Sequence, residues 1–73
     1  MEYYIYAGYY ELHITKERLS EPFVLWGKKG SFAEAVEEAQ RLDPDASLVF
    51  YRDTVDEAVE FFGLDDSSTL NVA

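Results

Sequence analysis

The stretch 31–44, SFAEAVEEAQRLDP, decides how this chain of 73 residues folds. Ser31 and Glu34 form a capping box, because the serine can accept from the amide three residues on and the glutamate can bond back. Pro44 ends the helix, since proline cannot continue its hydrogen-bond ladder. The spacing predicts a helix over residues 32–42, whose apolar stripe is Phe32, Ala35, Val36, Ala39 and Leu42.

Short apolar segments lie on both sides of this helix. FVLWG (23–27) precedes it and SLVFYR (47–52) follows it, and both are rich in β-branched and aromatic residues. We therefore expect strands at about 23–27 and 47–52. A strand that is reached through a helical crossover can lie parallel to an earlier strand, so parallel pairing of 47–52 is open.

The N-terminal segment EYYIYAGYYELHI (2–14) is predicted to be a strand that pairs with 23–27. Gly8 interrupts its pattern and predicts a bulge or a tight bend. At a period of two, one face contains Tyr4, Tyr6, Tyr10, Leu12 and Ile14. The other face contains Tyr3, Ile5, Tyr9, Glu11 and His13.

A second helix is predicted in TVDEAVEFFG (54–63). Thr54 and Glu57 have the spacing of another capping box, and Gly63 is a C-terminal cap. We expect the helix over residues 55–62, with an apolar stripe of Val55, Ala58, Val59 and Phe62. The polar tail either frays or adds a short edge strand through 69–72.

Together these elements predict one α+β domain over residues 1–73. Its sheet is expected to have three or four mainly antiparallel strands, with both helices packed on one face. The chain contains no cysteine, which excludes disulfides and thiolate metal sites. The N-terminus lacks signal-peptide order, and no apolar run approaches the roughly 20 residues that span a bilayer. We therefore expect a soluble, cytoplasmic protein.

Catalytic motifs are not recognisable in the sequence. His13 is the single histidine, and without a spaced partner it is expected to be a partly exposed strand residue. The segments 43–46 and 64–68 lack the ligand spacing of a calcium loop. We predict no catalytic residue, no metal site and no cofactor. The alternative, a small enzyme, would depend on His13 or on a carboxylate in a pocket.

The charge is concentrated in one half of the chain. Residues 1–31 contain four acids and four bases, whereas residues 32–73 contain eleven acids against Arg41 and Arg52 and so carry the whole net charge of −9. Such a surface repels phosphates, so direct binding to nucleic acid or to an anionic membrane is disfavoured. A basic protein surface is the complementary partner.

Six of these acids lie at helical spacing and form two polar ridges: Glu34, Glu37 and Glu38, and Asp56, Glu57 and Glu60. Neighbouring ridge residues are about 5–6 Å apart, which is comparable to the spacing of phosphates on a nucleic-acid strand. The ridges are either solvated helix faces or a partner-binding surface that mimics nucleic acid. Tyr3 and Tyr9 are candidate anchors, because tyrosine is common at interface hot spots. Core packing and cross-strand pairing are the alternative for the tyrosines.

In size, acidity and the lack of cysteine or a catalytic motif, the chain resembles small phage-encoded inhibitors of host defence, particularly anti-CRISPR proteins. The acids from Glu34 to Asp66 carry this resemblance. It implies a non-enzymatic inhibitor that occupies a nucleic-acid-binding surface of a complex such as a CRISPR effector. A second resemblance, through YYI (3–5) and SFAEAVEEAQ (31–40), is to HicB-like antitoxins. It covers residues 3–42 and implies a module that binds one cognate protein.

Overall fold

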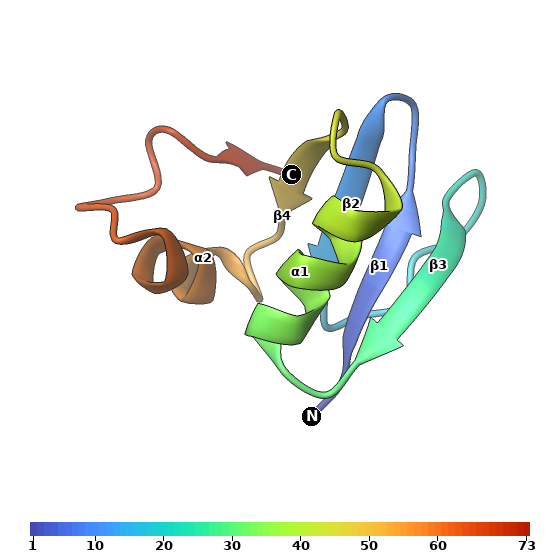
Figure 1. Cartoon of the computed structure of the whole chain (residues 1–73), viewed down its shortest axis with the longest axis horizontal. Helices are drawn as coiled ribbons and strands as arrows, with labels where there is room; N and C mark the ends of the chain where they lie inside the picture. The colour runs from blue at the N-terminus through green and yellow to red at the C-terminus, as the bar shows by residue number, and fades with distance from the viewer.

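The computed structural model describes all 73 residues and contains two helices and one five-stranded mixed sheet (Figure 1). The predicted α+β class is confirmed. The strands lie in the order β3-β1-β2-β4-β5. Their bounds are β1 Tyr3–Ala7, β2 Glu11–Thr15, β3 Val24–Lys29, β4 Ser47–Phe50 and β5 Asn71–Val72. The helices are α1 Phe32–Leu42 and α2 Val55–Phe62, the same ranges that the periodicity and caps predicted.

The sheet differs from the predicted one in the number and direction of its strands. β1 pairs antiparallel with β2 and with β3, whereas β2–β4 and β4–β5 are parallel pairs. The expected sheet of three or four mainly antiparallel strands is therefore wrong in these details. α1 carries the chain from β3 across β1 and β2 to β4, which is how a parallel neighbour of β2 arises.

The segment 2–14, predicted as one strand interrupted at Gly8, is a hairpin of two strands. The Gly8 amide donates to the Glu11 carbonyl at 2.9 Å and closes the turn. Tyr10 lies in the left-handed region, with a φ of 61°. Of the two predicted outcomes at Gly8, the tight bend is the one observed.

The hairpin changes which residues share a face of the sheet. Ile5 is opposite Ile14 on the face that α1 covers, and Tyr6 is opposite His13 on the other, outer face. The predicted faces grouped Ile5 with His13, which is wrong because the chain reversal restarts the alternation. The buried core on the α1 side contains Tyr3, Ile5, Leu12, Ile14, Phe32, Ala35, Val36, Ala39, Phe50 and Ala58.

The ends of α1 are as the sequence predicted. Ser31 Oγ accepts from the Glu34 amide at 3.2 Å, and Asp43 is the C-terminal cap before Pro44. The Glu34 carboxylate accepts from the Ser31 hydroxyl at 3.1 Å. This second bond closes the cap through side chains, so the carboxylate holds the first turn in place.

The start of α2 is built differently from the predicted capping box. Thr54 makes no side-chain cap; its hydroxyl donates to the Ile14 carbonyl at 2.8 Å and accepts from the Tyr51 amide at 3.0 Å. The capping box of Thr54 and Glu57 is therefore wrong, because a buried strand carbonyl takes the hydroxyl. Gly63 ends the helix in the left-handed region with a φ of 68°, as predicted.

α2 lies beside α1 at the β4 side of the sheet (Figure 1). Ala58 joins the core, and Phe61 contacts Phe32 with ring centroids 5.7 Å apart. β3 and β5 form the two edges of the sheet, so the tail adds the short edge strand that was one of its two predicted outcomes. Neither helix has the length and apolar character needed to cross a membrane.

Candidate partner-binding surface

The three predicted acids of α1 have different surroundings. The Glu38 side chain is 19% exposed and accepts two hydrogen bonds from Arg41, at 2.6 and 2.9 Å. These bonds hold the pKa of Glu38 below its usual value. Glu34 is bonded to Ser31, and Glu37 is exposed. Glu34 and Glu37 form no ion pair, so no cation of the chain neutralises them.

The acids of α2 divide in the same way. Glu57 Oε1 accepts from the Tyr3 hydroxyl at 2.7 Å and lies 3.2 Å from Lys16 Nζ, so Glu57 ties α2 to the hairpin. Asp56 and Glu60 are exposed and form no ion pair. Because they are four residues apart, they occupy one ridge of the helix. Two carboxylates of α2 are therefore available to a partner.

Tyr3 is not a surface anchor. Its ring is 6% exposed and packs edge-to-face on Phe32 with centroids 6.0 Å apart. The hydrogen bond to Glu57 raises the pKa of Tyr3 to about 12, with burial as a further cause. The prediction of Tyr3 as a partner-binding residue is wrong, because Tyr3 shares the face of β1 with Ile5 and the helices cover that face.

Tyr9 remains available, at the opposite end of β1 from Tyr3. It is 86% exposed at the hairpin tip, next to Tyr10 at 85%, and the two ring centroids are 5.5 Å apart. The Tyr10 carbonyl accepts from the Ser47 amide at 3.3 Å, which places the tip beside the start of β4. Tyr10 was not among the predicted anchors, since its exposure depends on the turn conformation.

His13 is buried, not partly exposed as predicted. Its Nδ1 lies 2.8 Å from the Tyr51 hydroxyl and its Nε2 lies 3.3 Å from Glu11 Oε1. The Phe23 ring covers it, with centroids 4.7 Å apart. Burial is the main cause that raises the pKa of Tyr51. With both ring nitrogens engaged, His13 joins β2 to the end of β4 and organises the outer face.

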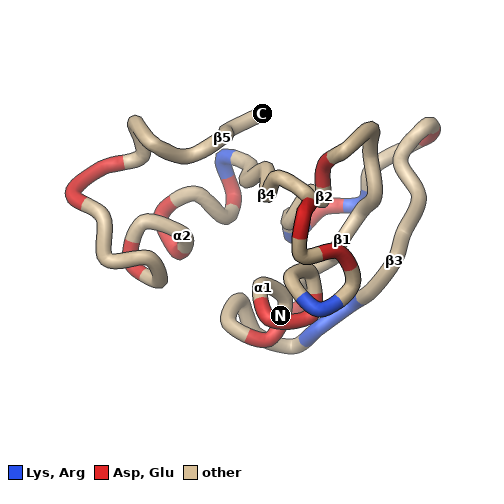
Figure 2. Tube along the Cα trace, turned by 45° about the horizontal axis from the view of Figure 1, so that its top comes forward, with Lys and Arg blue, Asp and Glu red and all other residues tan.

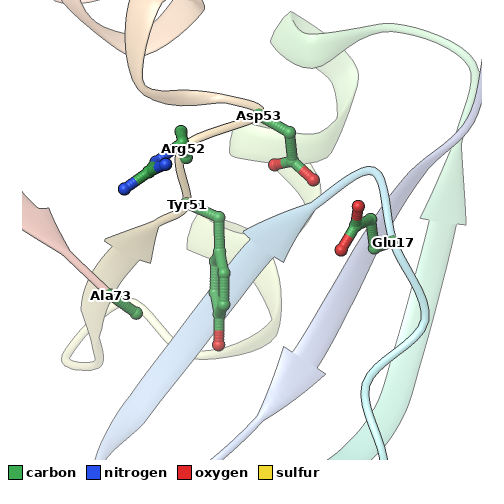
Figure 3. A pocket seen from close by; sticks show the side chains of 5 residues that line it. All are labelled: Glu17, Tyr51, Arg52, Asp53 and Ala73. Atoms are coloured by element: carbon green, nitrogen blue, oxygen red, sulfur yellow. The ribbon is translucent and has the colours of Figure 1, made fainter.

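A cavity of about 350 Å³ lies beside this network, lined by Glu17, Tyr51, Arg52, Asp53 and Ala73 (Figure 3). Asp53 Oδ2 accepts from the Thr15 hydroxyl at 2.9 Å and from the Lys16 amide at 3.2 Å. The carboxylates of Glu17 and Asp53 face one another across the cavity, whereas Arg52 points away from them. These bonds give Asp53 a structural role, in which it fixes the end of β2 to the start of α2.

The acids that stay unneutralised on the two helices define what we call the acidic surface: Glu34, Glu37, Asp56 and Glu60. Figure 2 shows acidic positions on both helices and in the loop after α2, and basic positions within α1, at the end of β3 and before α2. Of the six predicted acids, Glu38 and Glu57 are engaged within the fold. The pairing of Glu38 with Arg41 is a local i,i+3 contact, whereas the engagement of Glu57 could not be predicted, because Lys16 and Tyr3 reach it from distant parts of the chain.

Protein-family models, curated proteins and solved structures were compared with this chain, and none of them matches. The resemblances to anti-CRISPR proteins and to HicB-like antitoxins stay predictions. The functional conclusion therefore depends on the surfaces of this α+β domain, above all on the acidic surface.

Proposed function

We propose that the protein is a non-enzymatic inhibitor of the anti-CRISPR kind, which docks its acidic surface on a basic, nucleic-acid-binding surface of a protein complex. The observation that carries this proposal is that Glu34, Glu37, Asp56 and Glu60 are exposed on two adjacent helices without a cationic partner. The partner is a basic protein surface, with no direct contact to nucleic acid or membrane. The protein acts in the cytoplasm of the host cell.

The energetics of α2 support this proposal. Asp56 and Glu60 are like charges at i, i+4, an arrangement that disfavours a helix by about 0.2–0.5 kcal/mol. Asp56 lies in the first turn and gains from the helix dipole, whereas Glu60 lies in the last turn and gains nothing from it. A basic partner would turn this repulsion into attraction. It would also steer the encounter, so binding should weaken as salt screens the charges.

The exposed tyrosine pair at the hairpin tip, Tyr9 and Tyr10, would supply a second contact. Tyrosine is enriched among the residues that dominate binding energy at interfaces. The tip lies at the far end of β1 from the contact between Tyr3 and α2, so it would touch a different part of a large partner. Anchoring by Tyr9 and Tyr10 replaces the anchoring by Tyr3 and Tyr9 that the sequence predicted.

The test is capture of partners from bacterial lysate by the immobilised protein, at low and at high salt, identified by mass spectrometry. A nucleic-acid-binding complex that is retained at low salt and released at high salt is expected. Double reversal of Glu37 and Glu60 to lysine should abolish its capture. The matched control reverses Glu17 and Glu21, two exposed acids in the other half of the chain, and changes the net charge equally. Equal capture by both variants would contradict the proposal.

A second function, an antitoxin-like module that binds one cognate protein, is favoured by the edge strand β3. β3 pairs on one side only, and Val24, Leu25 and Trp26 on it are 57%, 50% and 47% exposed. An unpaired apolar edge can add a strand from another protein. Such a contact would be apolar, so capture should persist at high salt and fail in Leu25→Lys. Loss of capture at high salt would count against this function.

A further inference from the structure

We propose that the groove between α1 and α2 is an arginine-binding site, which takes the side chain of one arginine from the basic partner. This inference rests on the proposed function and names the chemical group that the acidic surface recognises. The groove has a volume of about 260 Å³ and is lined by Phe32, Ala33, Glu57, Glu60 and Phe61. Both helices contribute to it, and they lie side by side in Figure 1.

The floor of the groove is aromatic. Phe32 is buried, and Phe61 stands edge-to-face on it at 5.7 Å while remaining 45% exposed. Phe61 lines the groove together with Glu57 and Glu60, so part of its ring is open to a group that enters the groove. A guanidinium group stacks favourably on such a ring when it lies within about 6 Å of the centroid. Phe61 therefore offers an aromatic surface on which a planar cation can stack.

The walls of the groove contain two carboxylates, those of Glu57 and Glu60. Glu60 is exposed and forms no ion pair. Glu57 gives Oε1 to Tyr3 and Lys16, whereas its Oε2 is buried and accepts no hydrogen bond. Because Oε2 is closed off from the surface, Glu57 adds negative charge to the groove, and Glu60 is the acceptor that a partner can reach. Charge complementarity thus selects a cation as the occupant.

Arginine fits this combination better than lysine does. Its guanidinium has five N–H donors in one plane, so it can donate two hydrogen bonds to the Glu60 carboxylate while its face lies on the Phe61 ring. The lysine ammonium is a strongly hydrated point charge and cannot stack in this way. Ala33 leaves the α1 wall open for the aliphatic part of the side chain. Glu37 lies one turn along α1 from Ala33, so it would attract neighbouring basic residues of the partner.

The test is a titration of the ¹⁵N-labelled protein with a blocked pentapeptide that has one central arginine among glycines. At low salt, the amide shifts should be largest at Ala33, Glu60 and Phe61. Phe61→Leu removes the aromatic face and should weaken binding about fivefold. Glu60→Gln keeps the shape of an exposed side chain and should weaken binding by a similar factor. It tests the site independently if Phe61→Leu fails to fold.

The outcomes separate this inference from the proposed function. Shifts that spread over all acidic residues, or that centre on Asp65 and Asp66, would overturn the groove and leave the proposed function standing. Equal binding of the matching lysine peptide would overturn the selectivity for arginine. The double reversal of Glu37 and Glu60 to lysine can abolish capture from lysate while the arginine peptide causes no shift in the groove. That result would contradict the arginine-binding site and support the proposed function. If the reversal does not reduce capture and the peptide causes no shift in the groove, both the proposed function and the arginine-binding site are contradicted.

Discussion

The buried ring of His13 leaves no room for a side chain at position 8, directly after β1. A Cβ atom built on Gly8 would lie 3.1 Å from His13 Nε2 and 3.3 Å from the Phe23 ring. Both rings are held in place, His13 by its bonds to Tyr51 and Glu11 and Phe23 by its contact with His13. The packing of His13 and Phe23 on the outer face therefore requires glycine at position 8, directly after β1.

Gly8→Ala should lower the free energy of unfolding by about 1–3 kcal/mol, as expected for overpacking of a well-packed site. Urea denaturation measures this change. Gly30→Ala is the matched control, because a Cβ at Gly30 meets nothing within 4 Å and the variant should be neutral or slightly stabilised. Equal stability of the two variants would show that His13 and Phe23 shift to accommodate the added methyl group, which would contradict the prediction.

Tyr3 makes the stability sensitive to alkaline pH. Its pKa is raised from 10.0 to about 12 in the folded protein, mainly by the hydrogen bond to Glu57. The folded state keeps the proton that the unfolded chain begins to lose near pH 10.0, so this contribution is complete below pH 10.0 and is lost as the pH rises towards 12. Tyr3→Phe should reduce stability at neutral pH by about 1–2 kcal/mol, because a charge-assisted hydrogen bond is lost.

The difference between the wild type and Tyr3→Phe should narrow above pH 10.0, and denaturant unfolding across that range measures it. In a pH titration followed by tyrosinate absorbance, the variant should also lack the ionisation step near pH 12 that belongs to Tyr3. If the gap between the two proteins stays constant with pH, the bond between Tyr3 and Glu57 does not govern this titration.

Among the elements, α2 depends on a side chain that lies just before it. The Thr54 hydroxyl bonds the Ile14 carbonyl of β2 and the Tyr51 amide after β4, and Thr54 is fully buried. Thr54→Val should destabilise the protein by about 1–3 kcal/mol, because a buried acceptor and a buried donor lose their partner. Thr54→Ser retains the hydroxyl and should cost less. Thermal unfolding of both variants compares them, and equal melting temperatures would exclude this role.

For the whole molecule, the net charge of −9 predicts that salt stabilises the fold. The repulsion among unneutralised acids is screened over about 10 Å at 0.1 M salt, so the melting temperature should rise with moderate salt. The double reversal of Glu37 and Glu60 to lysine should be more stable than the wild type at low salt. It replaces a like-charge pair between Asp56 and Glu60 by an attractive one. A variant that is more stable yet fails to bind would separate function from folding.

The parts of the fold that could be predicted from the sequence are those that depend on local interactions. The bounds of both helices follow from apolar spacing, the Ser31 cap, Pro44 and Gly63, and each of these acts within a few residues. The direction of the strand after α1 was left open, since a helical crossover permits a parallel neighbour but does not by itself choose it. The concentration of acid on α1 and α2, which defines the acidic surface, could likewise be predicted because helical spacing is a local property.

Contacts between distant residues decided the rest. The hairpin turn at Gly8 placed His13 on the outer face under Phe23, and the packing of α1 on β1 buried Tyr3; neither could be predicted from a single strand over 2–14. Thr54 bonds Ile14 across the sheet, and Glu57 is taken by Tyr3 and Lys16. The sequence by itself determined the helices and the position of the charge along the chain, since these depend on near neighbours. Only the tertiary structure decided that Glu57 is engaged, because the folding of the chain brings Tyr3 and Lys16 to it, whereas Glu38 is paired with its near neighbour Arg41.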